Sequence, residues 1–310
     1  MENWEGECAM AYLYFLENLR HPVLDVIFSL ITLLGEETLF MAVGMIVFWC
    51  VDKYKGYYLL FVGFIGTVLN QFLKILCRVP RPWIRDPNFT IVESARKAAT
   101  GYSFPSGHTQ VSAGLFGGIA RMTNSKVLYV VMLTLATLVA FSRMYLGVHT
   151  PLDVLVSVAL AALLVLVGHP LFEKAKEKPK FMFAILFSFV VIVVAYLCFV
   201  LCFPLDAEPL NLRSAQKNGY TLLGCAVGLV LTYAVDLKWI HFETKAAWWA
   251  QIIKVVGGLA LVLAAKELLE APLDTLFDGH LAARAVRYFL MVVVGGILWP
   301  MTFRLVRKKE

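Results

Sequence analysis

Residues 181–203 read FMFAILFSFVVIVVAYLCFVLCF and contain no charged side chain. About 20 apolar residues are enough for a helix to cross the hydrocarbon core of a bilayer, so this stretch is typical of a transmembrane helix. The rest of the chain has a similar character, because 60% of its 310 residues are hydrophobic and only 16% are charged. This composition excludes an ordinary soluble domain, a disordered chain, a collagen and a disulfide-bonded scaffold.

Other apolar runs on both sides of this stretch predict further membrane helices. Together with it, the predicted spans are residues 37–51, 57–77, 106–121, 127–146, 151–168, 181–203, 219–236, 249–265 and 285–303. A shorter run at 22–34 is expected to form an interfacial or re-entrant helix. The expected fold class is therefore all-α, a polytopic membrane helix bundle with about 8–9 transmembrane helices.

Loop charges predict the orientation of these helices. Nine spans place most basic clusters on one side, which the positive-inside tendency makes the cytoplasm. These clusters are residues 52–55, 121–126, 173–180 and 238–245, and Arg304, Arg307, Lys308 and Lys309 in the tail. We therefore expect a multi-pass protein of the plasma (inner) membrane with a cytoplasmic C-terminus. The net charge of +6 is interpreted as a topology signal, and no nucleic-acid partner is expected.

One outer loop, residues 78–104, does not follow this charge pattern. It contains Arg78, Arg81, Arg85, Arg96 and Lys97. A basic loop on the outer side needs another reason, and binding of an anion is the simplest one.

Nearly all polar residues with catalytic potential lie in three short stretches. These are KILCRVPRP at 74–82, YSFPSGH at 102–108 and SRMYLGVHTPLD at 142–153. The predicted topology brings all three to the outer membrane face. We therefore expect one polar site there, facing the extracytoplasmic side.

The first and third stretches contribute the cations Lys74, Arg81 and Arg143. A single cation at a helix end more often snorkels to the lipid headgroups. Three cations that converge on one pocket instead favour phosphate binding, because arginine offers a planar fork and lysine a point charge. In the second stretch Ser106 is a good helix cap, and Gly107 allows the backbone to approach an anion closely.

His149 and Asp153 are spaced i, i+4, which places them on one face of a helix. A carboxylate there accepts the Nδ1 proton and leaves Nε2 as a nucleophile or base. An isolated membrane histidine is often only an interhelical contact, but the neighbouring acid and Arg143 favour catalysis. His108, on the other side of a bound phosphate, is placed to protonate a leaving oxygen.

The three stretches resemble the three signatures of the type-2 phosphatidic acid phosphatase family. The matching residues are Lys74 with Arg81 and Pro82, then Pro105 to His108, then Ser142, Arg143, His149 and Asp153. The resemblance covers roughly residues 20–170. Its superfamily also includes vanadium haloperoxidases and bacterial acid phosphatases.

The resemblance implies a mechanism and roles for the site residues. His149 is the nucleophile that forms a phosphohistidine, Asp153 orients it, and His108 is the general acid and base. The remaining residues hold the phosphate: Lys74, Arg81, Ser106, Gly107 and Arg143. The resemblance implies no metal and no cofactor, and the sequence shows no carboxylate cluster suited to magnesium.

The division of the chain follows from these assignments. We expect an acidic segment at 1–21, a lipid phosphatase core at 22–172, a basic cytoplasmic linker at 173–180 and an accessory transmembrane bundle at 181–310. The last part has no activity that the sequence reveals.

The function expected is that of an integral-membrane lipid phosphatase whose partners are the bilayer and a phosphorylated lipid. Undecaprenyl diphosphate, phosphatidylglycerophosphate, phosphatidate and sphingoid-base phosphates all fit as substrates. Two alternatives stay open: a lipid-linked phosphotransferase that uses the same site, and a lipid transporter or binding protein on this fold. A haloperoxidase is disfavoured, because the known ones are soluble.

Overall fold

The computed structural model describes residues 2–97, 99–202 and 208–305, with the side chains of residues 2–7 left out. Throughout these ranges the regular secondary structure is helical, which confirms the all-α class. Arg307, Lys308 and Lys309 of the predicted cytoplasmic tail lie outside the described residues. The chain divides into two compact units: unit 1 has residues 1–41, 62–169 and 206–211, and unit 2 has residues 42–61, 170–205 and 212–310.

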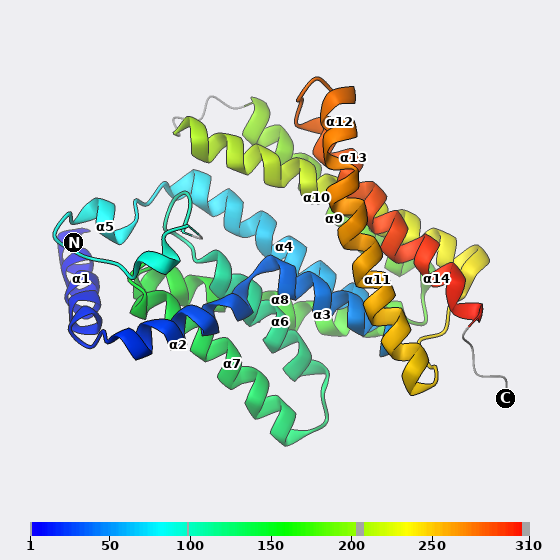
Figure 1. Ribbon diagram of the computed structural model, residues 1–310, viewed down its shortest axis with the longest axis horizontal. Coiled ribbons are helices and arrows are strands. Elements are labelled where there is room, and N and C mark those ends of the chain that lie inside the picture. Colours follow the sequence, from blue (N-terminus) through cyan, green and yellow to red (C-terminus); the bar gives the residue numbers. More distant parts are fainter. Residues whose placement is uncertain (1, 98, 203–207, 306–310) are drawn as a thin grey trace. The chain divides into compact units, whose positions relative to one another are not determined.

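Unit 1 holds the helices that carry the three polar stretches (Figure 1). Its elements are α1 (Glu2–Asn18), α2 (Pro22–Thr32), η1 (Leu33–Gly35), the start of α3 (Glu37–Cys50), most of α4 (Lys53–Cys77), α5 (Pro82–Arg85), η2 (Glu93–Ala95), α6 (Gly107–Met122), α7 (Lys126–Tyr145) and most of α8 (Pro151–Ala175). Helices α6 and α7 pack against each other as an antiparallel hairpin.

Local sequence explains where these helices begin. The Ser106 side chain accepts from the Thr109 amide and caps α6, as predicted, and Ser125 caps α7 in the same way. Helix α8 begins at Pro151, whose fixed backbone angle suits the first helical position. Residues 146–150 therefore form a short link between α7 and α8, and His149 lies on it.

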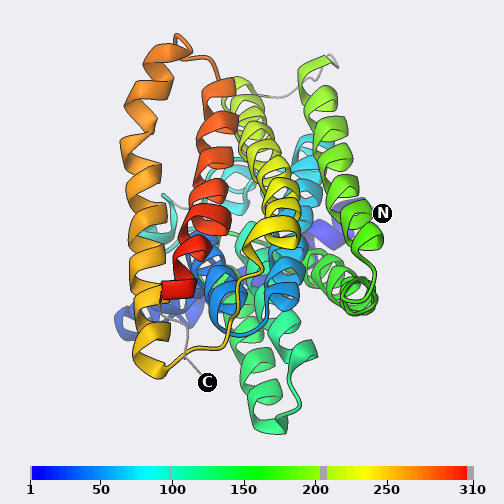
Figure 2. The same cartoon turned by 90° about the vertical axis from the view of Figure 1, so that its right-hand side faces the viewer.

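Unit 2 contains α9 (Pro179–Cys202), α10 (Pro209–Val235), the π-helical turn η3 (Asp236–Ile240), α11 (Trp248–Leu268), α12 (Glu270–Leu276), α13 (Ala282–Val293), the π-helical turn η4 (Val294–Leu298), α14 (Trp299–Met301) and η5 (Thr302–Leu305). Helices α11 and α13 lie side by side and are joined through α12 (Figure 2). The Lys254 ammonium, on a residue only 1% exposed, donates to the carbonyls of Glu243 and Thr244.

Six segments among the described residues are long and apolar enough to cross a membrane: Lys53–Arg85, Lys126–Tyr145, Pro151–Ala175, Pro179–Cys202, Pro209–Ile240 and Ala282–Leu305. The pair Pro22–Gly35 and Glu37–Cys50, bent by 49°, raises the number to seven if it is one span. The predicted count of 8–9 is not confirmed, because the spans expected at 106–121 and 249–265 are not among these segments. Helix α6 has 16 residues, about 24 Å, which is shorter than the roughly 30 Å hydrocarbon core.

Candidate active site

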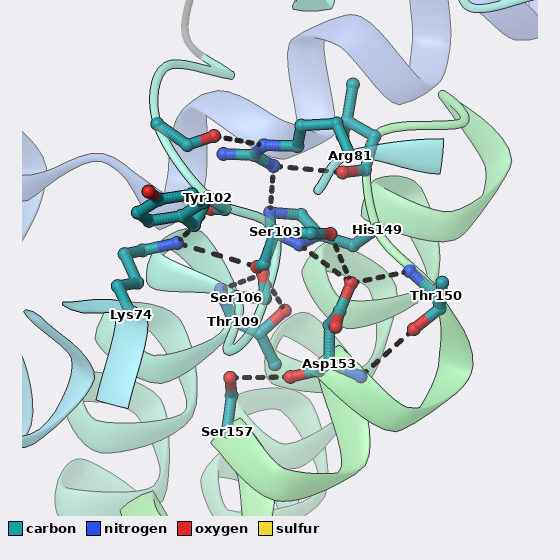
Figure 3. A network of polar contacts seen from close by, with 12 residues as sticks. Lys74, Arg81, Tyr102, Ser103, Ser106, Thr109, His149, Thr150, Asp153 and Ser157 are labelled. Atoms are coloured by element: carbon teal, nitrogen blue, oxygen red, sulfur yellow. Dashed lines mark hydrogen bonds and ion pairs between the residues drawn. The ribbon is translucent and has the colours of Figure 1, made fainter. Parts of the chain in front are cut away.

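The loops at one end of unit 1 bring the three polar stretches together (Figure 3). Arg81, which precedes the short helix α5, places Nη1 2.9 Å from Nε2 of His149. Lys74, in the last turn of α4, donates to the Tyr102 carbonyl at 2.7 Å. Ser106 at the start of α6 donates its amide to the Asp153 carbonyl at 3.2 Å. Residues from each stretch thus meet within one network.

Asp153 is the centre of this network. Its Oδ2 accepts from the Ser103 hydroxyl at 2.5 Å and from the Thr150 amide at 2.8 Å, and it lies 3.4 Å from His149 Nδ1. The residue is only 1% exposed. A buried carboxylate with several donors is held in one position, so Asp153 presents a fixed acceptor to the imidazole.

The contact with Arg81 assigns the protons of His149. A guanidinium has donors only, so Nε2 must accept through its lone pair. The imidazole proton is then on Nδ1, which faces Asp153. Burial lowers the pKa of His149 well below its usual range, and the positive charges of Arg81 and Arg143 lower that pKa further. His149 is therefore a neutral imidazole with an unprotonated Nε2.

Arg81 also ties three backbone segments together. Its Nε donates to the Gly101 carbonyl, Nη2 donates to Thr100, and Nη1 donates to Val148 as well as to His149. The side chain is almost fully buried. These contacts connect the loop before α6 to the link between α7 and α8, so Arg81 helps to set the position of His149.

Arg143, near the end of α7, is the most deeply buried cation of the site. It is fully buried, and its Nη1 donates to the Thr32 hydroxyl of α2 at 2.7 Å. Its Nε and Nη2 have no hydrogen-bond partner among the described residues. An unpaired buried guanidinium is costly, so these two donors are available for an anionic ligand.

The other predicted site residues, Gly107, His108 and Lys74, lie near the same network. A methyl group added to Gly107 would meet only Asn70 Oδ1 at 3.9 Å, so the backbone there is open on that side. His108, in the first turn of α6, has a buried Nε2 without a hydrogen-bond partner in the described part of the chain. Lys74 also approaches the Ser103 carbonyl at 3.5 Å. Their roles toward a substrate stay predictions.

The basic outer loop, residues 78–104, contributes fewer cations to the site than its charge suggests. Of its cations, Arg81 reaches the site, whereas Arg96 is exposed and forms an ion pair with Glu93. Sequence reasoning missed the partners that hold the site together: Ser103 and Thr150 on Asp153, and Thr32 on Arg143. Ser103 and Thr150 lie inside the polar stretches, so their position in the sequence could have marked them as site residues. Nothing in the sequence around Thr32 marks it in this way.

Among the described residues, no three His, Cys, Asp or Glu side chains group as metal ligands would.

Comparison with known proteins identifies the family. Residues 55–177 match the family model described as PAP2 superfamily. Phosphatidylglycerophosphatase B of Bacillus subtilis is 30% identical over 176 residues, which cover 51% of this chain and 80% of the relative. The chain belongs to the PAP2 superfamily. The family inferred from the three stretches is thus confirmed.

A second PAP2 model, for a transmembrane extension of superfamily phosphatases, matches residues 220–310. The helices to which the sequence assigned no activity are therefore in large part an extension known in PAP2 phosphatases. Together with the apolar helices, this match makes the chain a multi-pass membrane protein.

Two further similar proteins align with about half of this chain, and the first of them is matched over less than two thirds of its own length. A probable sphingosine-1-phosphate phosphatase of Dictyostelium discoideum is 31% identical over 159 residues, which cover 47% of this chain and 38% of the relative. A crystal structure of a transmembrane PAP2-type phosphatidylglycerolphosphate phosphatase from Bacillus subtilis is 28% identical, with a TM-score of 0.46. It covers 56% of this chain and 88% of that one.

Proposed function

We propose that this PAP2 protein is an integral-membrane lipid phosphatase that hydrolyses a lipid mono- or diphosphate. The observation that carries the proposal is the excess of buried cations over carboxylates in the site. Arg81 and Arg143 are 4% and 0% exposed, and Asp153 is the acid in contact with His149. A phosphate group supplies the negative charge that this arrangement lacks. The names of the matched relatives, all phosphatases of lipid phosphates, support the same substrate class.

The first chemical step is attack on phosphorus by His149. Its Nε2 forms the N–P bond while the bond from phosphorus to the lipid oxygen breaks. Burial and the positive charges of Arg143, Arg81 and Lys74 lower the pKa of His108 to about 3 in the free site, so His108 takes up its proton together with the phosphate, whose negative charge raises that pKa. It then donates this proton to the lipid oxygen, so the lipid leaves as an alcohol or, from a diphosphate, as a monophosphate. Asp153 stabilises the positive imidazole that results, because its Oδ2 faces Nδ1.

The second step releases phosphate. His108, now neutral, takes a proton from a water molecule, and the oxygen of that water attacks phosphorus. The N–P bond breaks, and its electron pair returns to Nε2 of His149. Throughout both steps Lys74, Arg81 and Arg143, with Ser106 and the Gly107 backbone, balance the charge on the phosphoryl oxygens.

We further propose that residues 22–172 are the phosphatase core and that 181–310 are an accessory bundle. The active site of the core faces the extracytoplasmic side of a plasma or inner membrane, as loop charges indicate. The lipid tail remains in the bilayer while the headgroup enters the site.

Phosphate release by the purified protein in detergent with EDTA tests this proposal. The panel contains undecaprenyl diphosphate, phosphatidylglycerophosphate, phosphatidate and a sphingoid-base phosphate. Release from at least one lipid in water alone is expected of a hydrolase. Release that requires an added alcohol acceptor would identify a phosphotransferase instead. Binding of lipids without release of phosphate would identify a transporter or binding protein.

A further inference from the structure

Two amide side chains, Asn70 on α4 and Gln110 on α6, lie inside unit 1 next to the phosphate-binding residues. They are 2% and 3% exposed. All four of their side-chain polar atoms are buried and have no hydrogen-bond partner among the described residues. An unpaired buried polar group is costly, and native proteins keep few of them. Two complete amides without partners among the described residues therefore indicate that a group from outside this part of the chain pairs with them.

The two amides lie one helical turn further into unit 1 than the phosphate-binding residues. Asn70 is four residues before Lys74 on α4, and Gln110 is four residues after Ser106 on α6. Because four helical residues rise about 6 Å, each amide lies one turn from a phosphate-binding residue. On both helices that turn leads away from the loops that carry Arg81 and His149.

Close packing of α4 and α6 keeps the two amides on facing surfaces. A methyl group on Gly66 would come within 2.9 Å of Gln110 Nε2, and one on Gly107 would come within 3.9 Å of Asn70 Oδ1. Gly66, Asn70 and Lys74 follow one another at i, i+4 and i+8 and thus share one face of α4. This face looks toward the first turns of α6, where His108 Nε2 also has no partner.

The chemistry of an amide defines what fits there. Each amide has an NH₂ donor and a carbonyl acceptor, and both parts are unpaired in Asn70 and in Gln110. A second phosphate group or an ester carbonyl satisfies the donors but leaves both carbonyl oxygens unpaired. A hydroxyl satisfies both, because it donates and accepts, whereas an alkylamine is an ammonium ion near neutral pH and pairs only with the carbonyl oxygens.

We propose that Asn70 and Gln110 form a subsite for a hydroxyl group of the lipid, a few bonds from the phosphoester oxygen. This inference rests on the proposed phosphatase function and narrows its substrate class. A sphingoid-base 1-phosphate carries both an amine and a hydroxyl in this region, and a monoacylglycerol 3-phosphate carries a hydroxyl. A polyprenyl phosphate and a fully acylated phosphatidate carry no donor there.

The test compares kcat/KM for three single-phosphate substrates of similar chain length in the same detergent. Hexadecyl phosphate has no neighbouring donor, 1-palmitoylglycerol 3-phosphate has a hydroxyl, and dihydrosphingosine 1-phosphate has an amine and a hydroxyl. We expect the wild type to prefer at least one donor-bearing substrate by about tenfold or more over hexadecyl phosphate, as one hydrogen bond would give. In Asn70→Leu and Gln110→Met, which approximate the shape of the amides, this ratio falls toward one. Exposed Asn124, changed to leucine, serves as the control and keeps the wild-type ratio.

A ratio within one preparation cancels losses from misfolded protein. Equal hydrolysis of all three substrates by the wild type would overturn the subsite and leave the phosphatase function intact. A wild-type preference that survives in both amide variants would also overturn it. So would variants that slow all three substrates by the same factor, as expected if the amides only hold buried water. No hydrolysis of any substrate, here or in the wider lipid panel, would instead contradict the proposed function.

Discussion

Nη1 of Arg81 lies 2.9 Å from Nε2 of His149, the atom proposed to attack phosphorus. In the absence of substrate the guanidinium thus occupies the lone pair of the nucleophile. A phosphoryl oxygen that enters the site offers Arg81 a charged acceptor, which is a stronger partner than a neutral imidazole. We therefore expect binding of the substrate to release Nε2 at the moment when phosphorus comes within its reach.

Arg81 thus both positions His149 and is proposed to bind the phosphate. We therefore expect activity to fall even when Arg81 is replaced by lysine. Arg81 makes four hydrogen bonds in the plane of its guanidinium, to Thr100, Gly101, Val148 and His149. A lysine cannot reproduce this fork. We expect Arg81→Lys to lower kcat/KM by about a hundredfold or more, close to the effect of Arg81→Met. Assays of phosphate release would measure it, and near-normal activity of the lysine variant would show that charge alone is needed.

Asp153→Asn should preserve the fold of the site but weaken catalysis. The amide keeps an oxygen for the Ser103 hydroxyl and the Thr150 amide but no longer stabilises a positive imidazole. A drop in kcat of about 10²–10⁴ is expected, the range seen for acids that orient a catalytic histidine. Ser157→Ala is a matched control, because Ser157 donates only to the backbone carbonyl of Asp153. A similar loss in both variants would indicate a structural role for this contact network.

The lowered pKa of His149 predicts an unusual pH profile. Because burial and the neighbouring guanidiniums lower the pKa of His149 well below its usual value of about 6.5, a fall in pH from 8 to about 6 does not protonate the nucleophile. Any acid limb of kcat/KM in that window then follows the substrate phosphate, whose second pKa is about 6. Two lipid phosphate analogues that differ by about one unit in that pKa should give acid limbs displaced by the same amount. Limbs that coincide near about 6.5, the usual histidine value, would contradict the assignment.

Thr32 is expected to act as a positioning residue for Arg143. Its hydroxyl accepts from Nη1 of Arg143 at 2.7 Å, and Thr32→Val removes that acceptor with little change in shape. Hydrogen bonds to charged groups are strong enough for a rise in KM of about tenfold. Thr32→Ser should restore most of the affinity, and Thr38→Val, at an exposed position of α3, should have no effect. A fall in kcat alone, without a change in KM, would speak against a role in phosphate binding.

The sequence allowed us to predict which stretches meet but not how they are held. Lys74, His108 and Arg143 all lie within the first or last turns of helices, so apolar run lengths and loop charges were enough to place them at one end. The contacts of Ser103 and Thr150 with Asp153 depend on the path of irregular loops, which leaves no periodic pattern in the sequence. Thr32 and Arg143 are 111 positions apart and belong to helices whose packing the sequence does not encode locally.

The number of membrane crossings was less predictable than the meeting of the three polar stretches. Apolar content alone suggested a crossing at 106–121, but α6 has only 16 residues. Its buried face carries Ser112, Thr109 and Gln110 beside its apolar residues. A helix that lines a polar site inside a bundle needs neither the length nor the uniform apolarity of one that faces lipid.

The central claim is that His149 is the nucleophile, and phosphate release by His149→Ala tests it most directly. The rate is measured on the best substrate of the wild type, with equal amounts of folded protein in EDTA-containing detergent. We predict a fall in kcat of at least about a thousandfold, because the N–P bond cannot form. A rate within about tenfold of the wild type would contradict the claim, since other groups would then carry the chemistry.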